Sequence, residues 1–406
     1  PLLMLGKKSK IIYSPLGVVL VISPWNYPIN TAITPALCAF LAGNSVVIKP
    51  SEATPMHGLL DTALRESGFM PEGMQVVMGG RNTGRKLIDL QPDKIFFTGS
   101  VRAGKEIMAQ AAAHLTAVEL ELGGKDPMVV FDDCNLERTL NGATWGVLNN
   151  TGQGCTSIER AFVQRGLYER FVAGLKEKFG KLSTTDTQSE DGGTLDIGSV
   201  TVDYQLAKIK AQVDEARAQG AEVWQAYEPR AGNNYPPTIV TNVTPDMAVQ
   251  CEETFGPVVT VVPFDSEADA IRLANDTVYG LSSSVWTNDL EKADRVARAL
   301  DAGNVCVNDV MITEGNSALP FGGVKQSGIG RYKGRVGLHN FCNIKSVMVD
   351  PAKKDGEINW YPYNEEKYQA MLTVMRAYFG RGGLVGLLHT AWMGLKIDSV
   401  VKRTKL

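Results

Sequence analysis

Residues 12–48 read IYSPLGVVLVIS, PWNYPIN, TAITPALCAFLA, GN and SVVI. The nearly continuous apolar run from Ile12 to Ser23 is rich in β-branched residues, which predicts a buried parallel strand. A turn follows, then a helix from Thr31 to Ala42 that ends at Gly43-Asn44. Ser45 to Ile48 forms the next buried strand. Strand, helix and strand in this order predict a βαβ unit.

The alternation of strands and helices continues along the chain. Helices are expected at 57–67 and 84–90, and strands at 75–78 and 94–97. This pattern predicts an α/β fold with a doubly wound, Rossmann-like parallel sheet, whose ligand lies beyond the carboxyl ends of the strands. After Glu121 a second set of elements predicts a second α/β domain. Its strands are expected at 127–131, 160–163, 258–262, 283–285 and 304–308, and its helices at 136–148, 167–179, 202–219, 267–275 and 290–300.

The composition is that of an ordinary globular protein. The 406 residues carry a net charge of −3, with 44% hydrophobic and 21% charged residues, so we expect two or three domains and no nucleic-acid partner. Six cysteines without C-x-x-C pairs and four dispersed histidines suggest neither a metal site nor a disulfide framework. A reducing, cytoplasmic location is therefore expected.

The stretch Asn149 to Thr156 (NNTGQGCT) surrounds one cysteine with small, turn-forming residues. Gly152 and Gly154 leave the approach to Cys155 unobstructed. A thiolate is intrinsically very nucleophilic, so Cys155 is a candidate nucleophile. The alternative is a buried structural thiol, because free cysteine is among the most buried residue types.

A second candidate is Glu121, which lies in an apolar segment directly before two glycines (LELGGK, Leu120–Lys125). Leucine neighbours that exclude water raise the pKa of a carboxyl group, which suits a general base. The alternative is a solvated glutamate at the end of a strand.

Together, the segments Glu121–Lys125 and Gly152–Cys155 resemble the two signature segments of the aldehyde dehydrogenase superfamily, in the family's order and spacing. Five further motifs are collinear with the family, and the resemblance runs from about Ile11 to Val349. These motifs are PWNYP (Pro24–Pro28), IKPSE (Ile48–Glu52), FTGS (Phe97–Ser100), EETFGP (Glu252–Pro257) and PFGG (Pro320–Gly323).

The resemblance implies NAD(P)-dependent oxidation of an aldehyde to a carboxylic acid. Cys155 would form a thiohemiacetal and then a thioester, Asn26 and the backbone N–H of Cys155 would hold the oxyanion, and Glu121 would activate the hydrolytic water. Relatives that acylate coenzyme A or act as reductases generally lack this glutamate, so its presence opposes that alternative. A catalytically silent binding protein that retains the fold is a further alternative, opposed by the intact Cys155, Glu121 and Asn26.

The resemblance also implies the cofactor residues, and the cofactor itself as NAD with NADP left open. Lys49 and Glu52 would contact the adenosine ribose, the Gly99–Gly104 segment the diphosphate, and Glu253 and Phe255 the nicotinamide ribose. A carboxylate beside the ribose repels the 2′-phosphate of NADP, so Glu52 favours NAD. The alternative for Lys49 and Glu52 is a surface ion pair. The full set is Trp25, Lys49, Ser51, Glu52, Gly99, Ser100, Gly104, Glu253 and Phe255.

Four segments are expected. Residues 1–121 would form the NAD-binding domain and residues 122–336 the catalytic domain. Residues 337–350 would form an oligomerisation strand and residues 351–406 a tail. In the family, the NAD-binding domain also has N-terminal helices, which would precede this chain. The pocket for the small-molecule aldehyde would be lined by Tyr27, Trp145 and Met311–Ser317. A homo-oligomer is also expected.

Within the tail, the apolar run Leu384–Leu395 is too short to span a membrane and is followed by basic residues. This pattern is typical of a helix that lies at a membrane surface, so contact through residues 384–405 is expected. Packing over the subunit's own surface is the alternative. The basic residues are Lys396, Lys402, Arg403 and Lys405.

Overall fold

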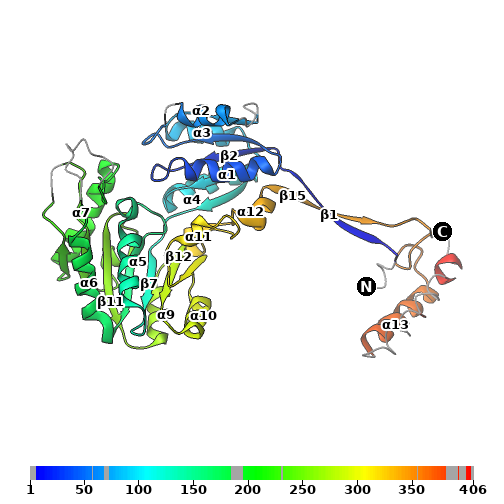
Figure 1. Cartoon of the computed structure of the whole chain (residues 1–406). Coiled ribbons are helices and arrows are strands. Elements are labelled where there is room, and N and C mark those ends of the chain that lie inside the picture. Colours follow the sequence, from blue (N-terminus) through cyan, green and yellow to red (C-terminus); the bar gives the residue numbers. More distant parts are fainter. Residues whose placement is uncertain are drawn as a thin grey trace. The chain divides into compact units, whose positions relative to one another are not determined.

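The computed structural model describes residues 6–56, 58–67, 73–183, 195–229, 232–353, 355–380, 392 and 399–403. The chain forms two compact units, one of residues Ser14–Asn343 and the other of Pro1–Tyr13 with Ile344–Leu406. The larger unit contains two open sheets with their helices, drawn from blue to yellow in Figure 1.

The first sheet has six strands among the described residues. In spatial order they are β14 (Gly328–Ile329), β6 (Ala117–Glu121), β5 (Lys94–Thr98), β2 (Val18–Ile22), β3 (Ser45–Lys49) and β4 (Met74–Val76). All neighbours are parallel except the short β14, which pairs antiparallel with β6. The connecting helices are α1 (Asn30–Leu41), α2 (Leu59–Glu66), α3 (Arg81–Asp89) and α4 (Val101–Ala112).

Helices cover both faces of this sheet because the buried strand residues alternate. Val19 and Val21 of β2 pack in one hydrophobic cluster with residues of α1 and α2. Leu20 and Ile22 point to the opposite face, where they pack with residues of α3 and α4. A strand buried on both faces is the signature of a doubly wound parallel sheet, as the sequence predicts.

The second sheet has seven strands among the described residues. In spatial order they are β13 (Asn304–Val307), β12 (Ser282–Trp286), β7 (Asp126–Val130), β8 (Ile158–Gln164), β11 (Val258–Phe264), β10 (Thr238–Thr241) and β9 (Glu222–Gln225). Only β9 is antiparallel to its neighbour. The main helices that accompany this sheet are α5 (Leu136–Leu148), α6 (Tyr168–Gly180), α7 (Asp203–Ala218), α9 (Glu267–Asn275) and α10 (Leu290–Ala299).

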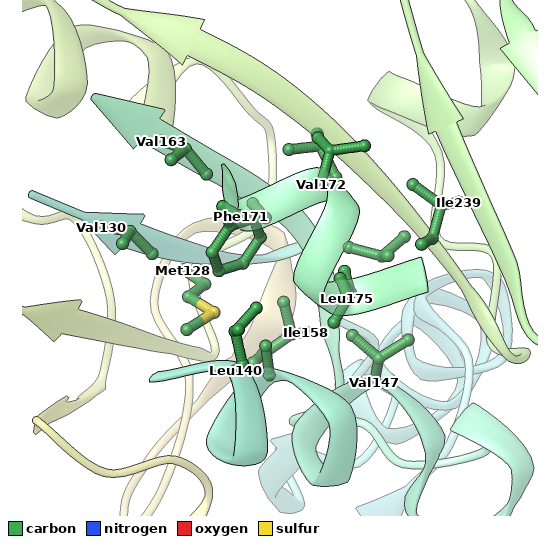
Figure 2. Close-up of a cluster of buried hydrophobic side chains, with 14 of the residues drawn as sticks. Met128, Val130, Leu140, Val147, Ile158, Val163, Phe171, Val172, Leu175 and Ile239 are labelled. Carbon is green, nitrogen blue, oxygen red and sulfur yellow. The ribbon is translucent and has the colours of Figure 1, made fainter. Parts of the chain in front are cut away.

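Both faces of this sheet are covered as well. Figure 2 shows Met128 and Val130 of β7 facing a cluster with Leu140 of α5 and Phe171 of α6. Val129, between them, packs with α9 and α10 residues on the other face. β6 ends at Glu121 in the first sheet and β7 begins at Asp126 in the second, so four residues link the two sheets.

The chain returns to the first sheet near its end. Phe321, Tyr332 and Phe341 belong to the same buried cluster as β2 and α1. This segment includes β14 and α12 (Gly334–Asn340). Residues 321–336 therefore pack with the first sheet, although the sequence groups them with the second set of elements.

The prediction of a single strand from Ile12 to Ser23 is wrong. The run is divided into β1 (Lys8–Pro15) and β2, because the backbone turns at Leu16-Gly17, where Gly17 has φ +135°. The side-chain oxygen Oδ1 of Asn44 accepts hydrogen bonds from the backbone N–H groups of Leu16 and Gly17, at 2.7 and 3.0 Å. β1 is largely exposed and pairs with β15 (Cys342–Val349) in a separate two-stranded sheet.

The C-terminal segment contains the helix α13 (Glu365–Gly380). Trp360, Tyr361 and Tyr363, which precede it, are all more than half exposed. The apolar run expected from Leu384 to Leu395 lies outside the described residues, apart from Trp392. No described helix is long and apolar enough to cross a bilayer.

Candidate active site

Cys155 lies in the tight connection between α5 and β8. After the short 3-10 turn Asn149–Gly152, in which Asn150, Thr151 and Gly152 have φ values of 50°, 58° and 68°, the chain turns into the cysteine. A Cβ at Gly152 would lie 2.1 Å from the carbonyl oxygen of Gly256, so this close approach of two backbones requires glycine. The two backbones thereby hold the cysteine turn against the loop that follows α8 (Ala248–Cys251).

Cys155 is partly buried and packs against the cluster that contains Phe321 and Tyr332. Burial, and next the charge of Glu314, raise the pKa of the Cys155 thiol well above its ordinary value. In the protein alone, the thiol is therefore held mainly in its protonated form.

Asn26 is held against the cysteine turn. Its Nδ2 donates a hydrogen bond to the carbonyl oxygen of Gln153, at 2.9 Å, and the side-chain amide of Asn150 donates to the carbonyl oxygen of Asn26, at 3.0 Å. An amide NH₂ carries two donors, so one N–H of Asn26 remains for a further acceptor. The sequence predicts this proximity only through the family resemblance.

Glu121 ends β6 and is only 4% exposed. Neither carboxylate oxygen has a hydrogen-bond partner, and a Cβ at Gly322 would lie 2.8 Å from Oε1. Burial, and next the charge of Glu119, raise the pKa of Glu121 well above its ordinary value. The glutamate is thus a buried, protonatable group and not a solvated one, and its charge acts on Cys155.

A cavity of about 700 Å³ opens beyond the carboxyl ends of the first sheet's strands. Six of the nine expected cofactor residues line it: Trp25, Lys49, Ser51, Glu52, Gly99 and Ser100. Gly104 does not line it. A Cβ there would lie 2.7 Å from Leu122 Cδ2, so this glycine allows α4 to approach the strand connection closely.

The cavity wall carries an ion pair and the N-terminus of a helix. Lys49 Nζ is buried and lies 3.2 Å from Glu52 Oε2, whose side chain is 58% exposed. Partial burial opposes ionisation of Glu52, but hydrogen bonds from its own backbone N–H and from Lys49 hold the pKa of this carboxyl below its ordinary value. Ser100 Oγ accepts the N–H of Ala103 and caps α4, whose N-terminus favours an anion.

Glu253 and Phe255 lie on the loop after α8. Glu253 Oε1 accepts the N–H of Gly124 at 3.2 Å, and burial raises the pKa of Glu253 to about 7. The Phe255 ring meets the Trp25 ring edge-on, with centroids 5.5 Å apart. This contact brings the loop from the second sheet to the residues that line the cavity.

Sequence reasoning missed the ion pair that supports this loop. Glu159 accepts hydrogen bonds from Lys125 Nζ at 2.5 Å and from the N–H groups of Thr254 and Phe255 at 2.7 and 2.8 Å. Both charged side chains are buried. The signal in the sequence was a glutamate inside the apolar strand 158–164, where a charge needs a partner.

Of the expected substrate-lining residues, Tyr27 lies beside the cysteine turn, where its hydroxyl donates to Asn149 Oδ1 at 2.6 Å. Met311 is buried and begins α11 (Ile312–Gly315) in a left-handed conformation. Trp145 is half exposed and lines a different cavity, of about 560 Å³, with Asp309 and Val310.

The six cysteines, all of which fall in the described part of the chain, are free thiols. No group of three or more His, Cys, Asp or Glu side chains in the described residues has the arrangement of a metal site.

The sequence of the chain matches the model of the aldehyde dehydrogenase family over residues 3–347. It is 42% identical to the 4,4'-diapolycopene aldehyde oxidase of a Methylomonas species over 380 residues, which are 93% of this chain and 70% of that protein. It is 39% identical to a betaine aldehyde dehydrogenase of Sinorhizobium fredii over 347 residues, 84% of this chain and 70% of that protein.

The structure is similar to the crystal structure of the betaine aldehyde dehydrogenase of Staphylococcus aureus in complex with NAD+. The TM-score is 0.80 at 35% identity, over 88% of this chain and 71% of the other. The chain therefore belongs to the aldehyde dehydrogenase family. The expected family, enzyme class and α/β fold are confirmed.

Proposed function

We propose that this enzyme oxidises an aldehyde to a carboxylic acid with NAD+, through a covalent intermediate on Cys155. The observation that carries the proposal is the hydrogen bond from Asn26 to Gln153, which holds an amide donor beside the cysteine turn. Glu121 interacts electrostatically with Cys155. A nucleophile, an oxyanion donor and a base are thus available at one place.

In this mechanism the Cys155 thiol loses its proton to solvent and its sulfur bonds to the aldehyde carbon. The resulting oxyanion accepts hydrogen bonds from Asn26 and from the backbone N–H of Cys155. Loss of a hydride from that carbon leaves a thioester on Cys155. Glu121 then takes a proton from a water molecule, whose oxygen attacks the thioester carbon. The acid leaves, and the sulfur regains its proton.

NAD+ supplies the hydride acceptor when it is bound. The cavity beside Trp25 fits such a group, because one wall carries the Lys49–Glu52 pair for a ribose and another the N-terminus of α4 for a diphosphate. Glu253 and Phe255 would hold the nicotinamide ribose. The NAD+ complex of the S. aureus relative supports this cofactor.

Rapid mixing of Glu121→Gln with aldehyde and NAD+ tests the proposal. Without the base, hydrolysis stops while thioester formation continues, so we expect one burst of NADH of about one equivalent per site and almost no turnover. Cys155→Ala, as the control, should give no burst. A Glu121→Gln enzyme that turns over normally would contradict the assignment of the base.

The names of the relatives supply two substrates for a first screen, 4,4'-diapolycopene aldehyde and betaine aldehyde. A series of aldehydes of graded chain length, read by NADH absorbance, extends the comparison. The substrate is the aldehyde with the highest kcat/KM.

We further propose a homo-oligomer that forms through the β1–β15 sheet. Its strands expose Ile11, Ile344 and Met348 by 50% or more, and exposed apolar edge strands favour pairing with another chain. Size-exclusion chromatography with light scattering measures the mass of the particle. A monomer would contradict the proposal.

We propose that the C-terminal segment contacts a membrane surface. The exposed Trp360, Tyr361 and Tyr363 support this proposal, since tryptophan and tyrosine favour the membrane interface. The match to the Methylomonas relative covers 93% of the chain and so extends beyond residue 347 into this segment. The six free thiols support a cytoplasmic location.

A further inference from the structure

Lys333 is a buried lysine beside the cysteine turn. It directly precedes α12, has φ +65° and is 8% exposed. Its ammonium lies 5.2 Å from the ring centroids of both Phe321 and Tyr332. Cys155 packs against the buried cluster that contains these two rings.

The ammonium of Lys333 is held by the segment next to the turn. Nζ donates a hydrogen bond to the carbonyl oxygen of Glu314 in α11. The carboxylate of the same Glu314 accepts a hydrogen bond from Thr156 Oγ1 at 3.1 Å, and Thr156 directly follows Cys155. Lys333, Glu314 and the cysteine turn thus form one connected group.

Besides Lys333, four carboxyl groups and the hydroxyl groups of Tyr27 and Tyr332 interact with Cys155. Glu121 ends β6, Asp126 begins β7, Glu253 follows α8 and Glu314 lies in α11. Their charges, together with burial, oppose ionisation of the thiol. A nucleophile that must act as a thiolate therefore needs a nearby positive charge, and Lys333 interacts electrostatically with Cys155, Glu121 and Glu314.

We propose that Lys333 is the counter-charge of the Cys155 thiolate and sets the reactivity of this nucleophile. Lys333 does not line the cofactor cavity, so its role is confined to the cysteine side of the site. Burial lowers the pKa of Lys333, while the negative charges around it, led by Glu314, favour the ammonium. The inference rests on the proposed function only in taking Cys155 as the nucleophile.

The test measures the alkylation of Cys155 by iodoacetamide as a function of pH, with the modified peptide quantified by mass spectrometry. Without the ammonium the thiol ionises at higher pH. We expect Cys155 of the Lys333→Met protein to be alkylated about tenfold more slowly at neutral pH, because a rise of about one unit in the pKa of the thiol lowers the thiolate fraction by about that factor. The rates of the two proteins should converge at alkaline pH, where both thiols are ionised.

Two further variants separate charge from packing. Lys333→Arg keeps the positive charge and should retain most of the wild-type rate. Glu314→Gln should accelerate alkylation, and the double variant Lys333→Met/Glu314→Gln should return towards the wild-type profile. If Lys333→Met does not fold, Glu314→Gln and Lys333→Arg still test the charge balance.

The same alkylation profile for Lys333→Met and the wild type would overturn the proposal, as would a Lys333→Arg protein as slow as Lys333→Met. The proposed function fails separately, if Cys155→Ala retains dehydrogenase activity. Because alkylation needs neither aldehyde nor NAD+, the two failures are distinguishable.

Discussion

The side-chain amide of Asn26 donates a hydrogen bond to the carbonyl oxygen of Gln153, 2.9 Å away, across 127 positions of sequence. Asn26 follows β2 of the first sheet, and Gln153 precedes Cys155 near β8 of the second. The contact joins the segment that lines the cofactor cavity to the segment that carries the nucleophile. The second donor of the Asn26 amide is the group that we assign to the oxyanion.

Replacing Asn26 by alanine should lower kcat/KM for the aldehyde by about 100- to 1,000-fold, because the oxyanion loses a preorganised donor. NAD+ binding should change little, since Asn26 does not line the cofactor cavity. Steady-state kinetics and a binding titration measure both. The matched control is Asn30→Ala, whose exposed side chain contacts Thr34. Equal kcat/KM for both variants and the wild type would contradict the oxyanion assignment.

Replacing Glu52 by glutamine should narrow the preference for NAD+ over NADP+. The carboxylate lines the cavity and lies 3.2 Å from Lys49, so its removal takes away a negative charge that repels a 2′-phosphate. The ratio of kcat/KM values for the two cofactors is the measurement, with Glu66→Gln on the exposed side of α2 as control. An unchanged ratio would show that Glu52 does not face the ribose.

Glu121→Gln should stabilise the folded protein near neutral pH. Since the pKa of Glu121 is raised in the folded state, the unfolded chain ionises first, and the wild type loses stability as pH rises above about 4.5. The free energy of unfolding falls by about 1.4 kcal/mol for each pH unit, up to the pKa of Glu121 in the folded protein. Glutamine does not ionise, so the variant keeps this free energy.

Urea unfolding of both proteins from pH 4.5 to 8 measures this difference in free energy. We expect the advantage of Glu121→Gln to be smallest at the acidic end and to grow with pH. The exposed Glu228→Gln is the control variant. A difference that does not depend on pH would mean that Glu121 ionises normally in the folded protein.

The fold could be predicted wherever the local signals agreed. The helix expected at 136–148 has these bounds in the structure, because Asn135 caps it by accepting the N–H of Arg138 at 3.2 Å. The two-residue strand β14 could not be predicted, since nothing local distinguishes it. It is a strand only because it pairs with β6.

The site was predictable at the level of residue types and motifs. Cys155, Glu121 and Asn26 stand out through the family resemblance, but their burial and contacts do not follow from the sequence. The Lys125–Glu159 pair joins two neighbouring strands, and the position of Lys333 depends on the return of the chain to the first sheet. Such contacts arise from tertiary packing, which a local pattern does not encode.

Removing the C-terminal segment should abolish weak binding to anionic membranes. The full chain should co-sediment with anionic vesicles and dissociate as the salt concentration rises, because basic residues contribute roughly 1 kcal/mol each near such a surface. A chain that ends at Asp355 should remain in the supernatant, and neutral vesicles serve as control. If both chains bind equally, or neither binds, the segment is a packing element of the subunit.

The covalent role of Cys155 is tested most directly by Cys155→Ala, with the exposed Cys251→Ala as the matched control. We predict that Cys155→Ala produces no NADH from any aldehyde that the wild type oxidises, while it still binds NAD+ with similar affinity, because the thiol does not line the cofactor cavity. Cys251→Ala should retain full activity. Turnover of Cys155→Ala at a rate close to that of the wild type would contradict the mechanism.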